Sequence, residues 1–101
     1  MSIQLKKGIL DLCVLSKLSL NDSYGYDIYQ TINNVLGISE STIYPILRKM
    51  VKEGYLTTYL QESPEGPARK YFKITRLGKK HLENLKDNWI TFVKDVNSLL
   101  R

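Results

Sequence analysis

The sequence predicts a mainly α-helical protein with one small β-hairpin, arranged as a winged helix-turn-helix with a C-terminal dimerisation helix. Three consecutive patterns carry this prediction. Residues 39–53 have the spacing of a helix with an apolar and a basic face, residues 55–75 have the composition of a hairpin, and residues 76–100 repeat an apolar seam. A basic helix followed at once by a basic hairpin is typical of winged helices. We expect residues 1–75 to form the winged helix and residues 76–101 to form the dimerisation helix.

Composition indicates a folded protein of one domain. The 101 residues are 43% hydrophobic and 25% charged, which allows a modest core. No apolar run approaches the ~20 residues of a membrane span, and the N-terminus lacks the pattern of a signal peptide. Cys13 is the single cysteine, so an internal disulfide is excluded and a reducing compartment fits. We expect a cytoplasmic protein that does not bind membranes.

The first expected helix, residues 5–20, is apolar on nearly all of its sides. Its apolar members are Ile9, Leu10, Leu12, Cys13, Val14, Leu15 and Leu18. A helix of this kind must be covered on more than one side. In a domain of this size the core covers one side, and a partner chain or a ligand is needed for the other.

The second expected helix is capped by Ser23 and continues to about Asn34, where a turn broken by Gly37 begins. The residues expected to face inward are Ile28 and Ile32. The tyrosines around the start of the helix are Tyr24, Tyr26 and Tyr29. These rings either pack half-buried or, in the case of Tyr24, donate a hydrogen bond to a DNA phosphate, which a helix N-terminus also favours.

The third expected helix, between an N-cap at Ser39 and Gly54 after its end, has two different faces. Its apolar stripe, at helical spacing, is Ile43, Ile46, Leu47, Met50 and Val51. The opposite face carries Ser41, Tyr44, Pro45, Arg48, Lys49 and Lys52. Hydroxyls and cations without an acid can lie against phosphates and base edges, although a solvated cationic face has the same composition. Pro45 removes one backbone hydrogen bond, which its amide would donate to Ser41.

The expected hairpin pairs residues 55–61 with residues 70–75 across a loop at residues 62–69. Arg69 and Lys70 flank that loop, so the wing has a basic edge. Residues 39–80 contain nine cations against four acids, whereas the segments before and after them are each neutral. The whole net charge of +5 therefore lies on the segment that contains the third helix and the hairpin. This distribution is the electrostatic footprint of a nucleic-acid binder.

The last expected helix starts at a Thr75 cap and continues to Leu100. Its apolar residues recur at heptad spacing and are Leu82, Leu85, Trp89, Phe92, Val96 and Leu99. A seam at the end of the chain, with no later helix to cover it, predicts a homodimer. The alternative is that the seam packs onto the first helix of the same chain.

The segments STIYPILRKMVKEGYL and GPARKYFKITRLG, with YGYDI before them, resemble the PadR family of bacterial transcriptional regulators. The short tail resembles the compact branch of that family, which includes multidrug-sensing repressors. The resemblance implies that the last helix packs against the partner's first helix. It also implies that Trp89 lines a site for a planar aromatic or cationic effector, with Leu12, Leu85 and Val93 as walls; the alternative is that Trp89 only fills the seam.

Together these patterns predict a dimeric repressor that binds a palindromic operator in double-stranded DNA. The residues expected to contact DNA are Tyr24, Ser39, Ser41, Thr42, Tyr44, Pro45, Arg48, Lys49, Lys52, Arg69 and Lys70. The alternative is a winged-helix module that binds another protein, since a fold does not settle a function.

We expect no enzymatic activity, cofactor or metal. His81 is the only histidine and is expected at the surface, while Cys13 is expected to be buried. Neither a zinc ligand set nor a phosphate-binding glycine loop is evident in the sequence.

Overall fold

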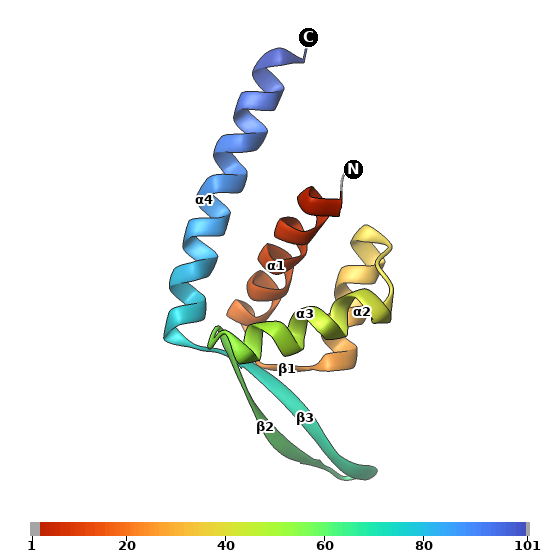
Figure 1. Ribbon diagram of the computed structural model, residues 1–101. Helices are drawn as coiled ribbons and strands as arrows, with labels where there is room; N and C mark the ends of the chain where they lie inside the picture. Colours follow the sequence, from red (N-terminus) through yellow and green to blue (C-terminus); the bar gives the residue numbers. More distant parts are fainter. Residues whose placement is uncertain (1–2, 101) are drawn as a thin grey trace.

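The computed structural model describes the backbone of residues 3–100 and the side chains of residues 8–100. Its elements are α1 (Ile3–Leu20), β1 (Ser23–Tyr24), α2 (Gly25–Leu36), α3 (Glu40–Lys52), β2 (Leu56–Ser63), β3 (Gly66–Ile74) and α4 (Arg76–Leu99). Figure 1 shows the hairpin of β2 and β3 projecting from one end of the helices, and the C-terminal half of α4 projecting from the other. The described chain is thus mainly helical with a small antiparallel sheet, as the sequence predicts.

The hydrophobic core lies where α1, α2 and α3 meet the base of the sheet. The inward residues predicted for α2 and α3 are confirmed, because Ile28, Ile32, Ile43, Leu47 and Met50 are buried. Ile46 and Val51 are half-buried against this core. The other buried apolar residues are Leu10, Val14, Leu15, Leu18, Ile38, Leu56, Phe72, Ile74 and Leu82.

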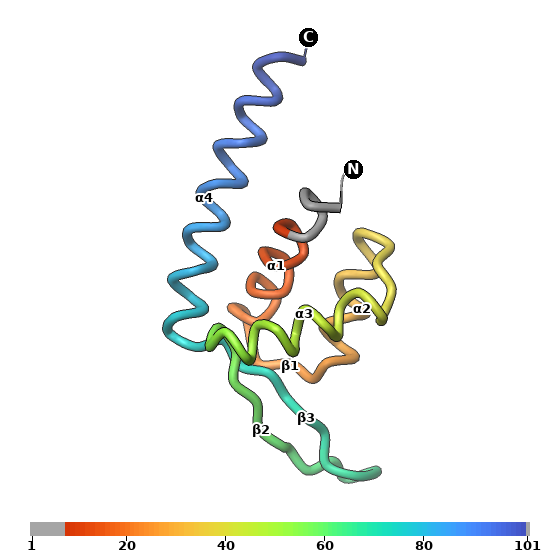
Figure 2. The backbone as a smooth tube through the Cα atoms, in the orientation of Figure 1, coloured from red at the N-terminus to blue at the C-terminus, as the bar shows by residue number. Residues whose placement is uncertain are grey.

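The sheet has three antiparallel strands in the order β1-β3-β2, and β1 was not predicted. Ser23, expected as a helix cap, instead pairs with Phe72 in the sheet and is buried. Figure 2 shows the backbone passing from α1 through this short strand into α2. Tyr24 is therefore the N-cap of α2, and the helix continues two residues beyond the expected end, to Leu36. Gly37 follows in the left-handed conformation, with φ 65°, which glycine adopts without strain.

The hairpin is longer than the composition indicated. Its two strands pair from Leu56 opposite Ile74 to Ser63 opposite Gly66, so the expected eight-residue loop is largely strand. The pairing is irregular between Gln61 and Ser63, which accommodates the prolines of this segment without a long loop.

The two ends of α3 differ in how their backbone groups are satisfied. Ser39 is the N-cap as expected, but its hydroxyl makes no hydrogen bond to a backbone amide. At the other end the Gly54 amide donates to Val51 and the Tyr55 amide donates to Met50, with Gly54 at φ 86°. This Schellman arrangement ends the helix at the glycine that the sequence indicated.

Helix α4 begins at Thr75, whose hydroxyl accepts a hydrogen bond from the Gly78 amide at 3.0 Å, as the cap prediction requires. Leu82 is buried and Leu85 is half-buried against the core of the same chain, in which α4 packs beside α1. Farther along, Trp89 is 38% exposed, Phe92 45% and Leu99 83%. The seam therefore divides into an inner half that the chain covers itself and an outer half that it does not. None of the described helices is long and apolar enough to cross a membrane.

Candidate nucleic-acid interface

The basic side of α3 faces solvent along its length. Arg48, Lys49 and Lys52 are exposed, opposite the buried stripe of the same helix. Lys49 lies 3.8 Å from a carboxylate oxygen of Glu53, so part of its charge is neutralised. Arg48 and Lys52 have no such carboxylate partner among the described residues.

Three hydroxyls gather at the N-terminus of α3. The Ser39 hydroxyl lies 2.9 Å from that of Ser41 and 3.2 Å from that of Thr42. These hydrogen bonds replace the expected bond from the Ser39 side chain to a helix amide. All three residues are exposed, so each hydroxyl also remains accessible to an external acceptor.

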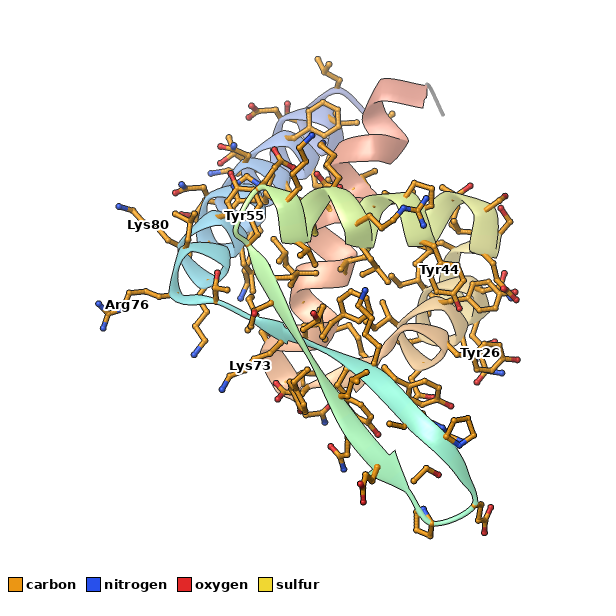
Figure 3. All side chains as sticks on the ribbon, turned by 60° about the horizontal axis from the view of Figure 1, so that its bottom comes forward. Tyr26, Tyr44, Tyr55, Lys73, Arg76 and Lys80 are labelled. Atoms are coloured by element: carbon orange, nitrogen blue, oxygen red, sulfur yellow. The ribbon has the colours of Figure 1, made fainter. Side chains whose placement is uncertain are left out.

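A concave site of about 420 Å³ lies between the start of α2, the middle of α3 and strand β3. Five of the predicted DNA-contacting residues come together in it, namely Tyr24, Tyr44, Arg48, Arg69 and Lys70. Its other lining residues are Gly25, Tyr26, Leu47 and Phe72. Figure 3 shows Tyr44 and Tyr26 side by side at one edge of the molecule. The site combines cations with phenol groups, a combination that suits a phosphate backbone.

Tyr44 is held in this site by close contact with the backbone of α2. A Cβ atom on Gly25 would lie 3.0 Å from Cε1 of Tyr44, so the absence of a side chain at Gly25 admits the ring. Burial, with a smaller contribution from Glu40 and the neighbouring tyrosines, raises the pKa of Tyr44. Its phenol therefore keeps its proton at neutral pH and can donate a hydrogen bond.

A chain of aromatic rings connects the wing to the start of α2. The guanidinium of Arg69 lies 4.8 Å from the ring centre of Tyr24, a cation–π distance. The Tyr24 ring lies 5.8 Å from that of Tyr71, which in turn lies 5.7 Å from that of Tyr59. The Tyr59 hydroxyl donates a 2.7 Å hydrogen bond to Asp22, and this bond raises the pKa of Tyr59. These contacts tie the middle of the hairpin to the segment that precedes α2.

The remaining predicted contact residues lie outside the concave site. They are Ser39, Ser41, Thr42, Pro45, Lys49 and Lys52, which are exposed on α3 or at its N-cap. Among the lining residues that the prediction missed, Gly25 and Tyr26 had a signal, since a glycine between two tyrosines marks a place of close approach. Phe72 had none, because its register in β3 depends on the unpredicted strand β1.

Comparison with known proteins decides between the classes that share this fold. Residues 14–84 match the model of the transcriptional regulator PadR-like family. The chain belongs to the PadR-like family of transcriptional regulators. The matched segment covers the winged helix and the first turns of α4. This PadR-like protein is accordingly a DNA-binding regulator of transcription, as the sequence pattern predicted.

Solved structures and a sequence relative agree with the family. A PadR-like transcriptional regulator from Bacillus cereus is 38% identical, with a TM-score of 0.88 and 97% of each chain covered. A protein from Streptococcus mutans is 42% identical, with a TM-score of 0.88, 93% of this chain and 88% of that chain covered. An uncharacterized protein from Lysinibacillus sphaericus is 35% identical over 92% of this chain and 88% of its own length.

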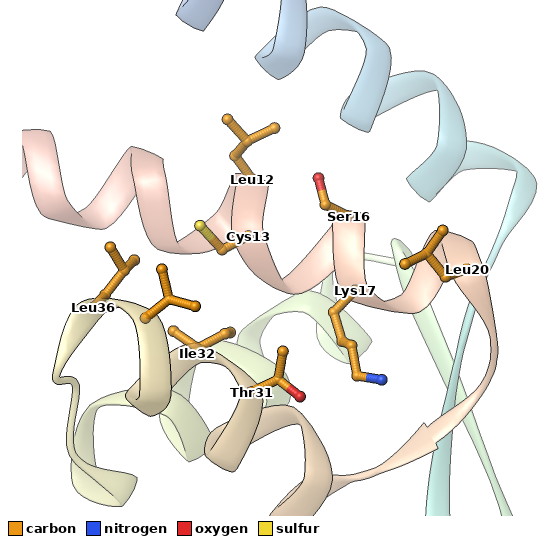
Figure 4. A pocket seen from close by; sticks show the side chains of 9 residues that line it. Leu12, Cys13, Ser16, Lys17, Leu20, Thr31, Ile32 and Leu36 are labelled. Carbon is orange, nitrogen blue, oxygen red and sulfur yellow. The ribbon is translucent and has the colours of Figure 1, made fainter.

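Two apolar hollows lie on either side of α1 in this PadR-like protein. One, of about 190 Å³, is lined by Gly8, Ile9, Leu12, Leu85, Asn88, Trp89 and Phe92. It brings together three of the four predicted ligand-contacting residues, whereas Val93 is not among its lining residues. The other, of about 400 Å³, lies between α1 and α2 and is drawn in Figure 4. Leu12 belongs to both, and burial raises the pKa of Cys13 in the second.

His81 differs from its expected surface position. Its ring is half-buried and stacks on Tyr55 with the centroids 4.1 Å apart and the planes 8° from parallel. The ring thus helps to seat α4 on the corner after α3. Cys13 is likewise half-buried rather than fully buried. Among the described residues no group of three His, Cys, Asp or Glu side chains is arranged to hold a metal ion.

Proposed function

We propose that this PadR-like regulator is a cytoplasmic homodimer that represses transcription by occupying a palindromic operator. Residues 1–75 bind DNA and residues 76–101 dimerise. The observation that supports this most is the concave site, in which α3, the start of α2 and the basic edge of the wing present cations and phenols together. Two recognition helices enter successive major grooves, about 34–36 Å apart.

The two kinds of contact have different roles. Arg48 contacts a base edge, because its exposed guanidinium lies at the middle of α3, and the hydroxyls of Ser41 and Thr42 join it from the first turn. Arg69 and Lys70 contact phosphates from the wing, and the phenols of Tyr24 and Tyr44 hydrogen-bond the backbone. Pro45, Ser39, Lys49 and Lys52 complete the surface of α3 that meets the groove.

Alanine substitutions separate these roles. After selection of bound sites from random DNA, Arg48→Ala is expected to weaken binding to the selected site by roughly 1–3 kcal/mol and to relax the preference at one base pair. Arg69→Ala and Lys70→Ala are expected to weaken binding to every duplex alike and to reduce the salt slope by about 0.9 each. Lys94→Ala, an exposed cation on the outer part of α4, serves as the control. Unchanged binding in all variants would favour a protein-interaction module instead.

Dimerisation has a specific apolar surface to support it. The outer residues of α4 remain exposed in the single chain, and so does the groove between α1 and α2, where Leu20 is 80% and Val35 78% exposed. We infer that a second copy covers the outer seam, which comprises Trp89, Phe92, Val96 and Leu99 beyond the self-covered Leu82 and Leu85. The N-terminal helix of the partner is the surface that this seam meets.

A second proposed function is sensing of a planar effector at Trp89. The hollow that Trp89 shares with Leu12 and Leu85 supports it, and the Trp89 and Phe92 rings lie 6.2 Å apart beside it. Val93, half-buried one turn along, completes the wall from outside the hollow. Stacking between the Trp89 indoles of two protomers would hold a flat aromatic or cationic molecule.

Intrinsic fluorescence tests this site directly, because Trp89 is the single tryptophan of the chain. An acridine or a Hoechst dye is expected to quench it saturably and to release DNA. Trp89→Ala is expected to abolish the release while the dimer persists by light scattering. Absence of quenching across a panel of planar cations, with the dimer intact, would assign Trp89 to packing alone.

A further inference from the structure

Four exposed cations surround the start of α4, away from the concave site. We call them the corner patch: Lys73 at the end of β3, and Arg76, Lys79 and Lys80 on the first turns of α4. None of them lies within 4.0 Å of a carboxylate oxygen of the described residues. They account for nearly half of the nine cations in residues 39–80. The basic excess that the sequence placed on one helix and one hairpin is therefore divided between two surfaces.

The location of these cations is unfavourable for the stability of α4. The first turn of the helix contains no acidic residue, although a helix N-terminus carries a partial positive charge that favours acids and disfavours cations. Arg76, Lys79 and Lys80 are also three or four positions apart, so they lie on one face and repel one another. Glu83 follows on the same face without forming an ion pair with them. An external polyanion would relieve this repulsion.

The corner patch is fixed firmly to the end of the recognition helix. Thr75 donates from its hydroxyl to the Gly54 carbonyl at 2.7 Å and from its amide to the Tyr55 carbonyl at 3.0 Å. Gly54 and Tyr55 follow α3, whose last residue is the exposed Lys52. The basic surface thus continues from α3 around the corner to α4. Figure 3 shows Lys73, Arg76 and Lys80 at the edge opposite Tyr26 and Tyr44, with the tip of the hairpin also on the far side.

We propose that the corner patch is a second phosphate-contacting surface, which extends the DNA footprint past the C-terminal end of α3. This inference rests on the proposed DNA-binding function and adds residues that the concave site does not contain. Lysine ammonium groups on flexible stems contact phosphates as point charges and carry no base preference. The corner patch therefore adds affinity and salt dependence but no sequence specificity.

A pair of double variants on the same helix tests the proposal. Lys79→Gln with Lys80→Gln removes two charges from the corner patch, and Lys86→Gln with Lys94→Gln removes two exposed charges farther along α4. Affinity for a random-sequence duplex of about 40 base pairs, which exceeds the span of two half-sites, is measured over a range of salt concentrations. The full-length dimer is used throughout, and its melting temperature is recorded for each variant.

The corner variant is expected to lose about 0.9 from the slope of log affinity against log salt for each lysine–phosphate contact removed. The control variant is expected to keep the wild-type slope, although it loses the same net charge. The melting temperature of the corner variant is expected to equal or exceed that of wild type, since it removes cations from a helix N-terminus. A corner variant with the slope of the control, beside a wild type that binds DNA, would overturn this inference alone. A wild type that does not bind DNA would overturn the proposed function as well.

Discussion

Replacing Phe92 and Val96 together by aspartate is expected to convert the protein into monomers. Both residues belong to the outer half of the α4 seam, where the single chain leaves Phe92 45% exposed and Leu99 83% exposed. If a second copy covers this seam, each new carboxylate must leave water without a partner, at a cost of several kcal/mol. Loss of the dimer should also weaken operator binding, because the two half-sites would no longer be bound by one assembly.

Light scattering and circular dichroism together measure this effect. The matched control is Lys94→Asp with Ser98→Asp, which adds the same two carboxylates to the exposed opposite side of the helix and is expected to leave the dimer intact. A well-folded dimer in the Phe92/Val96 variant would show that the seam is not the interface. The outer half of α4 would then need another explanation for its exposed apolar residues.

Gly78→Ala is expected to be among the most destabilising single substitutions in the chain. A Cβ atom on Gly78 would overlap the carbonyl oxygen of Tyr55 and lie 2.8 Å from Cγ1 of Ile74. The backbone of Gly78 cannot retreat, since its amide donates the capping hydrogen bond to Thr75. We expect a loss of about 3 kcal/mol in the free energy of unfolding, or roughly 12–24 °C in melting temperature for a domain of this size.

Thermal unfolding followed by circular dichroism provides the measurement, and Gly66→Ala provides the control. Gly66 lies at the tip of the hairpin and does not have a positive φ, and no atom lies within 4 Å of the position that a Cβ atom would take there. Its replacement should change the melting temperature by only a few degrees. If Gly78→Ala melted with the control, the start of α4 would not be seated on the corner after α3 as described.

The elements with a long periodic pattern were predictable from the sequence, and the short or irregular ones were not. The faces of α3 followed from helical spacing, which repeats often enough in thirteen residues to exclude other structures. Strand β1 contains two residues and has no period, so the residue type of Ser23 indicated a cap instead. The hairpin was predicted too short because Pro64, Gly66 and Pro67 are typical of loops, whereas an irregular register admits two of them at or within the start of β3.

The candidate site was predictable in its residue types but not in its assembly. Charge and hydroxyl content indicated the basic side of α3 and the wing. That Tyr44 rests on Gly25, or that Arg69 stacks on Tyr24, depends on how α2, α3 and β3 meet. The position of Arg76, Lys79 and Lys80 on α4 was also missed, because a charge count along the sequence does not divide one basic segment between two surfaces.

Salt-dependent binding of the wild-type protein to a random-sequence duplex tests the central claim most directly. Arg69 and Lys70 of two protomers provide at least about four phosphate contacts, so the slope of log affinity against log salt is expected to be about −3.6 or steeper. Each lysine of the corner patch that contacts a phosphate steepens it further. Binding that is absent at low salt, or that does not change with salt, would contradict the account and leave a protein-interaction module as the better description of this winged helix.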